Sequence, residues 1–153
     1  MPFAPALTFA FEIRATLAPT LHVGHGDGEK TEFTPITGGT VDGPLLRGTV
    51  LPGGGDWSNT RGRVVELDAR YLLRTDDGAV IDIVNRGYYH EDADCPDQHD
   101  GDLQVTKAGV YYRTSPTFRT DAQAYRWLAR TVFVGLAREA EDHSVAIRMY
   151  ALS

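Results

Sequence analysis

Asp56 and Trp57 are the residues whose types and setting best suit chemistry, because they follow three consecutive glycines at positions 53–55. Glycines let a chain adopt conformations closed to other residues and bring backbone N–H groups close to a bound molecule. A carboxyl group that an indole shields from water has a raised pKa, as a general acid or base near neutral pH requires. We therefore predict Asp56 as a catalytic residue and Trp57 as a ligand-binding residue. The alternative is a tight corner in which Trp57 fills the core and Asp56 caps free amides.

Asn85 and Tyr71 are polar side chains on strand faces that otherwise carry isoleucine and leucine. A polar group on an inward face either has a hydrogen-bond partner in the core or faces a ligand in the lumen. We predict a catalytic role for Asn85 and a ligand-binding role for Tyr71. Tyr112 belongs to an aromatic cluster that mostly indicates core, and we keep it as a ligand-binding candidate.

Other side chains with ligand chemistry gather in two polar stretches: His22, His25 and Asp27 in the first, and His90, Asp94, Cys95 and His99 in the second. Neither stretch has the spacing of a zinc site or of a calcium loop, so solvated loops are favoured and no metal is predicted. Surrounding carboxylates raise the pKa of a thiol and disfavour Cys95 as a nucleophile. The glycine runs match neither a phosphate-binding loop nor a dinucleotide fingerprint, and no cofactor is predicted.

The elements that must position these residues are strands, because apolar and polar residues alternate with a period of two. The alternation covers residues 7–14, with Leu7, Phe9, Phe11 and Ile13 on one face, and residues 65–74 and 81–86. Asp77-Gly78 between the last two strands is typical of a hairpin turn. Further strands are expected over residues 41–51, 107–114, 130–136 and 145–152.

One short helix is expected near residues 121–129, where Thr120 and Gln123 resemble a capping box. Many strands joined by glycine-rich turns indicate a sandwich or a barrel, and closure of the sheet removes exposed edges. We predict an all-β fold, a single domain over residues 1–153 that forms one closed antiparallel β-barrel of about eight strands or more.

The composition restricts the partners. A net charge of −6 over 153 residues argues against nucleic acid and anionic membrane surfaces. The sequence shows neither an apolar stretch of membrane-spanning length nor a basic leader, and it has one cysteine. A cytoplasmic protein is therefore expected.

Three stretches resemble a known family: PITGG, GPL and GTVLPGGGDW in residues 35–57, LDARY, TDDGA and NRG in residues 67–87, and YRT, WL and FVG in residues 112–135. Over nearly its whole length the chain resembles the bacterial and fungal domain of unknown function 3237 family. The resemblance implies a closed antiparallel barrel, similar in shape to calycin or allene-oxide-cyclase-like barrels, and no established activity. The chain departs from the family at residues 89–102, His22 and His25.

Arg70 and Arg86 lie on the polar faces of their strands, among Glu66, Asp68 and Asp82. An exterior face with ion pairs between neighbouring strands is favoured for most of these residues. The alternative turns this face into the lumen, where the arginines would hold an acidic or carbonyl-bearing ligand. Arg70 lies inside a family motif and is kept as a catalytic candidate, with Arg86 as a ligand-binding one.

Two functions of different class follow from these residues. The first is a cofactor-independent enzyme that binds a small, largely apolar molecule, phenolic, polyketide-like or terpenoid-like, and acts as an isomerase, cyclase, lyase or hydrolase by acid–base chemistry. The alternative is a barrel that binds or carries such a molecule without changing it. A homodimer is also predicted, because both faces of residues 130–136 are apolar and need cover.

Overall fold

A double pairing of the first strand closes the sheet. In the computed structural model, which describes residues 2–153, β1 pairs antiparallel with β12 and also with β3. The described residues form β1 (Leu7–Leu17), β2 (Leu21–Gly26), β3 (Glu29–Asp42), β4 (Gly48–Val50), β5 (Gly55–Arg61), β6 (Val64–Thr75), β7 (Val80–Glu91), β8 (Gln98–Asp100), β9 (Leu103–Thr106), β10 (Val110–Arg119), the 3-10 helix η1 (Gln123–Arg130), β11 (Phe133–Ala140) and β12 (Ser144–Leu152).

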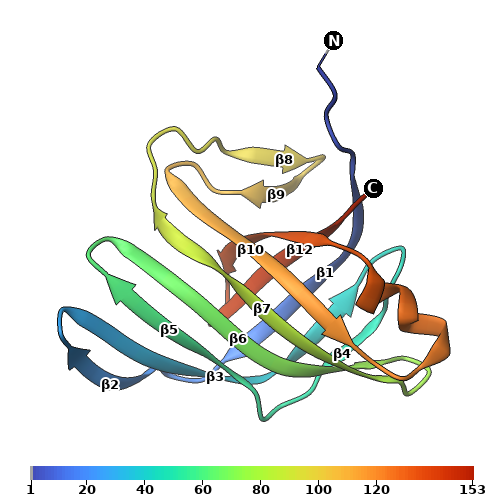
Figure 1. Ribbon diagram of the computed structural model, residues 1–153, viewed down its shortest axis with the longest axis horizontal. Helices are drawn as coiled ribbons and strands as arrows, with labels where there is room; N and C mark the ends of the chain where they lie inside the picture. The colour runs from blue at the N-terminus through green and yellow to red at the C-terminus, as the bar shows by residue number, and fades with distance from the viewer. Residues whose placement is uncertain (1) are drawn as a thin grey trace.

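The order around the wall is β1, β12, β11, β10, β7, β6, then β4 and β5, then β3 (Figure 1). The short strands β4 and β5 share one place, because each pairs with both β3 and β6 at different heights. The barrel therefore has eight strand positions. This confirms the predicted all-β closed antiparallel barrel with one short helix.

One end of the barrel is filled by side chains. Phe118 lies edge-on to both Phe11 and Phe133, with ring centroids 5.9 and 5.1 Å away. Leu128 of η1 is buried in the same cluster, so the helix covers this end. The expected capping box is not formed, because the residue before the helix is Ala122 and the Thr120 hydroxyl accepts a hydrogen bond from the backbone N–H of Ala122 instead.

Several strand boundaries differ from the predictions. The stretch 41–51 is not one strand, since β3 ends at Asp42 and Gly43 packs directly on the backbone of Phe11. A one-residue bulge in β1 breaks its alternation, so that Ala10 and Phe11 are both buried while Phe9 lies against Tyr150, with ring centroids 5.8 Å apart. The predicted single face through Leu7, Phe9 and Phe11 is therefore wrong.

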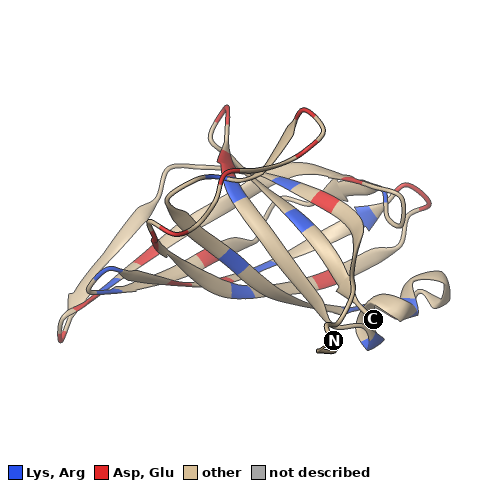
Figure 2. Cartoon of the chain, turned by 90° about the horizontal axis from the view of Figure 1, so that it is seen from above, with Lys and Arg blue, Asp and Glu red and all other residues tan. Residues whose placement is uncertain are grey.

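A buried ionic cluster lies on the outside of the barrel. Glu12 accepts hydrogen bonds from both terminal nitrogens of Arg138, at 3.3 and 3.4 Å, and lies 4.0 Å from Arg148. Arg148 also donates to Asp100 in the β8–β9 hairpin at 3.0 Å. The hairpin buries Val105 and Thr106, and β9 contacts β11. The cluster therefore attaches the long β7–β10 connection to the wall, whose other charges lie along the strands and at the loop tips (Figure 2).

Among the described residues, no helix is long and apolar enough to cross a membrane. The outer face of β11 carries Val134 and Leu136, which are half-buried, and Val132 in front of the strand is exposed. The homodimer stays a prediction.

We expect Glu12→Gln to lower the free energy of unfolding by about 3 kcal/mol, because it leaves the buried guanidinium group of Arg138 without a counter-charge and leaves that of Arg148 with Asp100 alone. Urea denaturation followed by circular dichroism measures the effect. Asp42→Asn is the matched control, since it removes one carboxylate from the exposed pair with Arg47 and should leave the midpoint unchanged. Equal stability of the Glu12 variant and the wild type would show that the cluster does not hold the wall.

Candidate functional site

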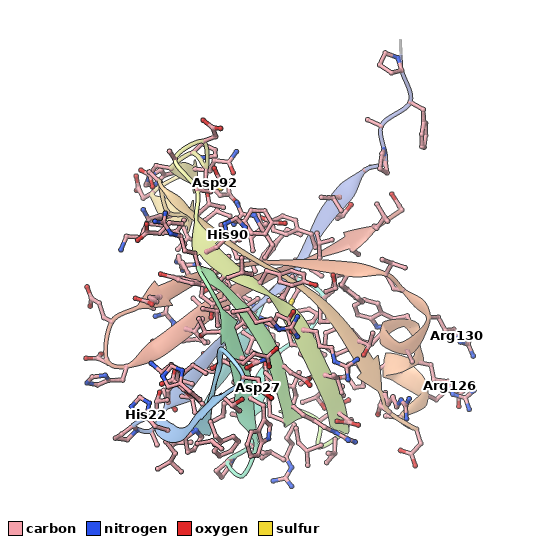
Figure 3. All side chains as sticks on the ribbon, turned by 60° about the vertical axis from the view of Figure 1, so that its left-hand side comes forward. His22, Asp27, His90, Asp92, Arg126 and Arg130 are labelled. Atoms are coloured by element: carbon pink, nitrogen blue, oxygen red, sulfur yellow. The ribbon has the colours of Figure 1, made fainter. Side chains whose placement is uncertain are left out.

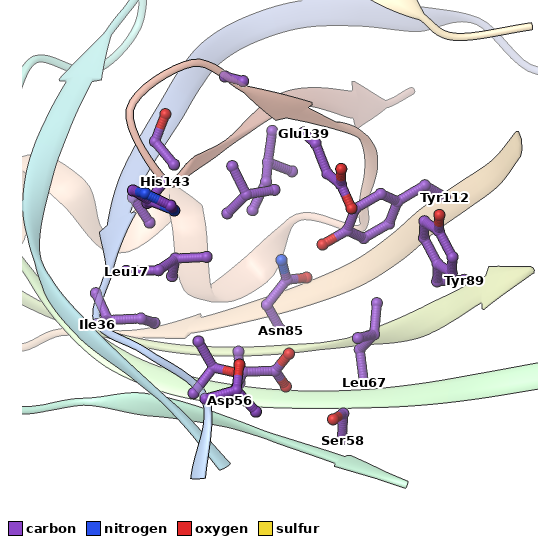
Figure 4. A pocket seen from close by; sticks show the side chains of 18 of the residues that line it. Leu17, Ile36, Asp56, Ser58, Leu67, Asn85, Tyr89, Tyr112, Glu139 and His143 are labelled. Atoms are coloured by element: carbon purple, nitrogen blue, oxygen red, sulfur yellow. The ribbon is translucent and has the colours of Figure 1, made fainter. Parts of the chain in front are cut away.

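The end of the barrel away from η1 is hollow. A cavity of about 980 Å³ opens there, and its wall includes the last residues of β1 and the turn between β11 and β12 (Figure 4). Volumes of this order accommodate a drug-sized ligand. The cavity and the aromatic core therefore divide the barrel into two halves along the strand direction.

The register of three neighbouring strands places the polar side chains at successive depths. Asn85 of β7 is opposite Ala69 of β6 and Pro116 of β10. The next inward-facing row toward the mouth contains Thr114, and the row after it contains Tyr89 and Tyr112. Successive inward rows are two residues apart because the side-chain period of a strand is two. Polar side chains of β7 and β10 thus line the cavity from the aromatic core to the mouth, while β6 contributes Ala69, Leu67 and Val65 to the same rows.

Asp56 lines the cavity from β5, on the side opposite Tyr112 (Figure 4). The β5–β6 pairing is interrupted between Asp56↔Ala69 and Asn59↔Glu66, so the N–H of Asp68 donates to the Asp56 carboxyl oxygen Oδ1 at 3.0 Å. Burial raises the pKa of Asp56 to about 6, with a smaller contribution from the charge of Asp68, while the Asp68 N–H acts in the opposite direction. One carboxyl oxygen is thus fixed, and the group can exchange a proton near neutral pH.

Three buried side-chain oxygens in this region have no hydrogen-bond partner within residues 2–153: Tyr71 Oη, Asn85 Oδ1 and Thr114 Oγ1. Buried polar atoms are nearly always paired, so a group of three beside a cavity indicates a place for a polar ligand. Burial raises the pKa of both Tyr71 and Tyr112, and the negative charge of Asp56 adds to the effect. Both phenols therefore keep their protons and can donate hydrogen bonds.

Trp57 is not in the cavity. Its side chain is 55% exposed on the outer wall, where it packs on Phe33 with ring centroids 4.7 Å apart. Neighbouring residues of a strand point to opposite faces, so Asp56 facing inward turns Trp57 outward. The predicted roles of Trp57 as a lumen residue and as the shield of Asp56 are therefore wrong, since the barrel wall itself shields the carboxyl group.

Arg70 and Arg86 are also on the outer wall, as the favoured alternative predicted for most of that face. Arg70 pairs with Asp82 at 3.0 Å, and Arg86 pairs with Asp68 at 3.2 Å. Their predicted catalytic and ligand-binding roles in the lumen are wrong for the same reason of alternation. The structure brings Asp56, Asn85, Tyr71 and Tyr112 together around the cavity.

The sequence analysis missed Tyr89, Glu139 and His143, which also line the cavity. Tyr89 faces inward because it lies four residues after Asn85 in β7, and Glu139 because it lies six residues after Phe133 in β11. Both were missed because the predicted strands ended too early, at residues 86 and 136. His143 follows Asp142 in a turn where both residues have positive φ, 54° and 60°. The position of the His143 side chain depends on that turn. The turn could not be predicted from the sequence, because neither of its two positive-φ residues is a glycine.

The histidines predicted to lie in solvated loops are distributed over separate surfaces. His22 lies in β2 and is 2.7 Å from Glu32, and His99 is 3.0 Å from Asp97. His90 stacks on Tyr111, well away from His22 and Asp27 (Figure 3). In the part of the chain that the structure describes, no three histidine, cysteine or acidic side chains are grouped closely enough to hold a metal ion. Burial and the nearby Asp92 raise the pKa of Cys95.

Two of the three glycines before Asp56, Gly54 and Gly55, allow close strand packing. Gly54 is in van der Waals contact with the backbone of Arg70 and Tyr71, and a Cβ there would clash with both. We expect Gly54→Ala to lower the free energy of unfolding by about 3 kcal/mol, because β5 has to move away from β6. Gly26→Ala is the control, since a Cβ added at Gly26 would meet no atom within 4 Å and the φ of Gly26 is not positive. Thermal denaturation of both variants tests this, and similar melting temperatures would contradict it.

Ionised Asp56 should make the fold less stable. Its pKa is about 6 in the folded protein and about 3.8 without the fold, so the folded state binds the proton more tightly. This stabilisation is complete below about pH 4 and is lost as the pH rises through about 6. We expect Asp56→Asn, which keeps the acceptor for the Asp68 N–H, to exceed the wild type in stability by about 2–3 kcal/mol at neutral pH and to approach it at acidic pH. Urea denaturation across this range measures the difference, which a constant offset would contradict.

Comparison with known proteins gives relatives over nearly the whole chain. A UPF0311 protein of Clostridium acetobutylicum is 34% identical over 153 residues, which cover 94% of this chain and 91% of that protein. A β-barrel-like protein of Acinetobacter baumannii, solved by crystallography, superposes with a TM-score of 0.84 at 31% identity and covers 100% of this chain and 99% of that one.

A fungal protein is more distantly similar. The hydroalkoxylation enzyme phnH of Penicillium herquei is 28% identical over 129 residues, which cover 83% of this chain and 70% of that protein. A model of the DUF3237 family, described as proteins of unknown function, matches residues 5–152. The predicted resemblance is confirmed, and the chain belongs to the DUF3237 family.

Proposed function

We propose that this protein is an enzyme that binds a small, largely apolar organic molecule in the barrel and acts on it by general acid–base chemistry at Asp56. The observation that carries the proposal is a carboxyl group inside a cavity whose pKa burial raises to about 6. Such a group gives and takes a proton at similar cost near neutral pH, which is the property of an efficient general acid or base.

The groups around Asp56 suit a positioning role. The unpaired oxygens of Asn85 and Tyr71 lie in the same region, and the side chains of Asn85 and Tyr112, from the neighbouring strands β7 and β10, point toward one another (Figure 4). A phenol donates a hydrogen bond to a carbonyl or enolate oxygen, and the amide oxygen of Asn85 accepts one from a hydroxyl group. Bound between them, a substrate would present its reacting carbon or oxygen to Asp56.

Among the reactions open to these groups, we favour the intramolecular addition of a hydroxyl group across a carbon–carbon double bond. The fungal relative is named for hydroalkoxylation, and its sequence covers most of this chain. In this reaction one alkene carbon gains a proton, the other forms a bond to oxygen, and the hydroxyl group loses its proton. The atoms balance without a further reactant, and one carboxyl group near pH 6 can supply the first proton and receive the second.

A carrier of small molecules is the second candidate, and the cavity alone suits it equally well. The state of Asp56 favours the enzyme. Holding a carboxyl group where burial raises its pKa lowers the stability of the ionised protein, and a carrier gains nothing from that. Perturbed titratable groups in cavities are typical of catalytic sites.

The proposal is tested with phenols that carry an allyl side chain next to the hydroxyl group. The wild type in deuterium oxide should form a cyclic ether with one deuterium on carbon, detected by mass spectrometry. Asp56→Asn should lower the rate by about 100-fold or more, because the proton donor is lost while the shape is kept. Arg70→Gln and Trp57→Phe are the controls, since both side chains lie on the outer wall and should leave the rate unchanged.

The outcomes separate the two candidates. Turnover by Asp56→Asn at the wild-type rate would exclude acid–base catalysis by this residue. Binding of the phenols without turnover of any of them, by the wild type and the variant alike, would support the carrier.

A further inference from the structure

The charges that line the cavity have one sign. Three carboxyl groups line it, those of Asp56, Glu139 and Asp142, and the described lining contains no lysine or arginine. Glu139 belongs to the end of β11 and Asp142 to the β11–β12 turn, whereas Asp56 reaches the cavity from β5. A ligand in the cavity therefore meets carboxyl groups from two different parts of its wall.

The arginines of the same strands are held outside. Arg70 and Arg86 pair with Asp82 and Asp68 on the outer wall, and Arg138 pairs with Glu12 beneath the β8–β9 hairpin. Arg113 lies over the ring of Tyr111, 5.2 Å from its centroid, also on the outer face. Because side chains alternate between the two faces of a strand, each of these arginines can face the lumen only if its whole strand shifts its pairing by one residue. The segregation of charge is therefore built into the strand pairing.

Negative charge in the lumen acts on the neutral groups there. Burial raises the pKa of Tyr112, and the charges of Asp56 and Glu139 raise it further. Any second anion placed beside these carboxylates loses its hydration and meets repulsion that the low polarity of the interior strengthens. The described lining offers no lysine or arginine to offset either cost.

The unpaired oxygens set a second requirement. Asn85 Oδ1 is an acceptor only, and the hydroxyl oxygens of Tyr71 and Thr114 accept as well as donate. A ligand that offers these oxygens no hydrogen-bond donor leaves them unpaired in a site that excludes water, and its binding free energy is less favourable for that reason. A hydroxyl group supplies both a donor and an acceptor at one atom, and it carries no charge.

We propose that the cavity selects uncharged molecules bearing a free hydroxyl group and rejects carboxylates and phosphate esters of the same size. This inference rests on the proposed function only in using the same cavity. It specifies the class of substrate, and it holds for an enzyme and for a carrier alike. A reaction that supplies the substrate must therefore release it with any phosphate removed and any carboxylate lost or esterified.

The test compares three ligands with one ring system and different charge: naphthol, naphthoate and naphthylmethylammonium. Their binding to the full-length protein is measured by isothermal titration calorimetry at about pH 8, where imidazole side chains carry little charge. We expect naphthol to bind about tenfold or more tightly than naphthoate, and naphthylmethylammonium to bind less tightly than naphthol but more tightly than naphthoate, because it loses hydration without meeting repulsion from the carboxylates.

The variant Asp56→Asn/Glu139→Gln removes two negative charges from the lining and keeps the side-chain shapes. It should reduce the difference between naphthol and naphthoate to about threefold or less. Asp42→Asn is the control, because it removes a carboxylate from an exposed outer pair and should leave the difference unchanged. Unchanged circular dichroism spectra establish that the variants are folded.

The proposal is overturned if naphthoate binds as tightly as naphthol to the wild type, or if the lining variant keeps the full difference. It is also overturned if none of the three ligands binds. These results concern the ligand class, whereas the proposed acid–base function is judged by turnover: it fails when Asp56→Asn keeps the wild-type rate or when the phenols bind without being turned over.

Discussion

The closure of the sheet by β1 is the constraint on which the rest of the structure depends. Because β1 pairs with β12 along one edge and with β3 along the other, every strand of the wall has an inside and an outside. Side-chain alternation then fixes which residues face the lumen, and a shift by one residue would exchange the two sets completely. The position of Asp56 inside and of Trp57 outside is the direct consequence.

Closure also explains how a barrel of this size holds a cavity. The inward rows near η1 carry phenylalanine, leucine and isoleucine, which meet across the axis and fill it. Toward the other end the inward rows of β6, β7 and β10 include the small residues Ala69, Gly87 and Thr114, which leave the lumen open beyond the aromatic core. The aromatic half supplies the burial that stabilises the fold, while the open half leaves room for a ligand.

The fold was largely predictable from the sequence, because alternation, turns and a family resemblance all indicate a closed antiparallel sheet. The inward positions of Asn85 and Tyr71 followed from the same alternation. The strand β5 was missed because its glycines suggested a loop, whereas Gly54 and Gly55 allow the close approach of β6 and Phe33. Arg70 was kept for its place in a family motif, yet its pairing with Asp82 across β6 and β7 depends on which face closes inward. That choice is made by the whole sheet and is not visible in one strand.

Asp56 shows how the wall and the chemistry are connected. Its Oδ1 oxygen accepts the N–H of Asp68, which the interrupted β5–β6 pairing leaves free, and the hydrogen bond holds the carboxyl group in a fixed orientation. That hydrogen bond lowers the pKa of Asp56, but burial raises it more. The pKa therefore stays about 6, close enough to neutral pH for the carboxyl group to exchange its proton. A cation from the lining would lower this pKa further, as any neighbouring positive charge does. The exclusion of arginine from the lumen therefore serves two ends at once, since it keeps Asp56 able to exchange its proton and makes the cavity unfavourable for anions.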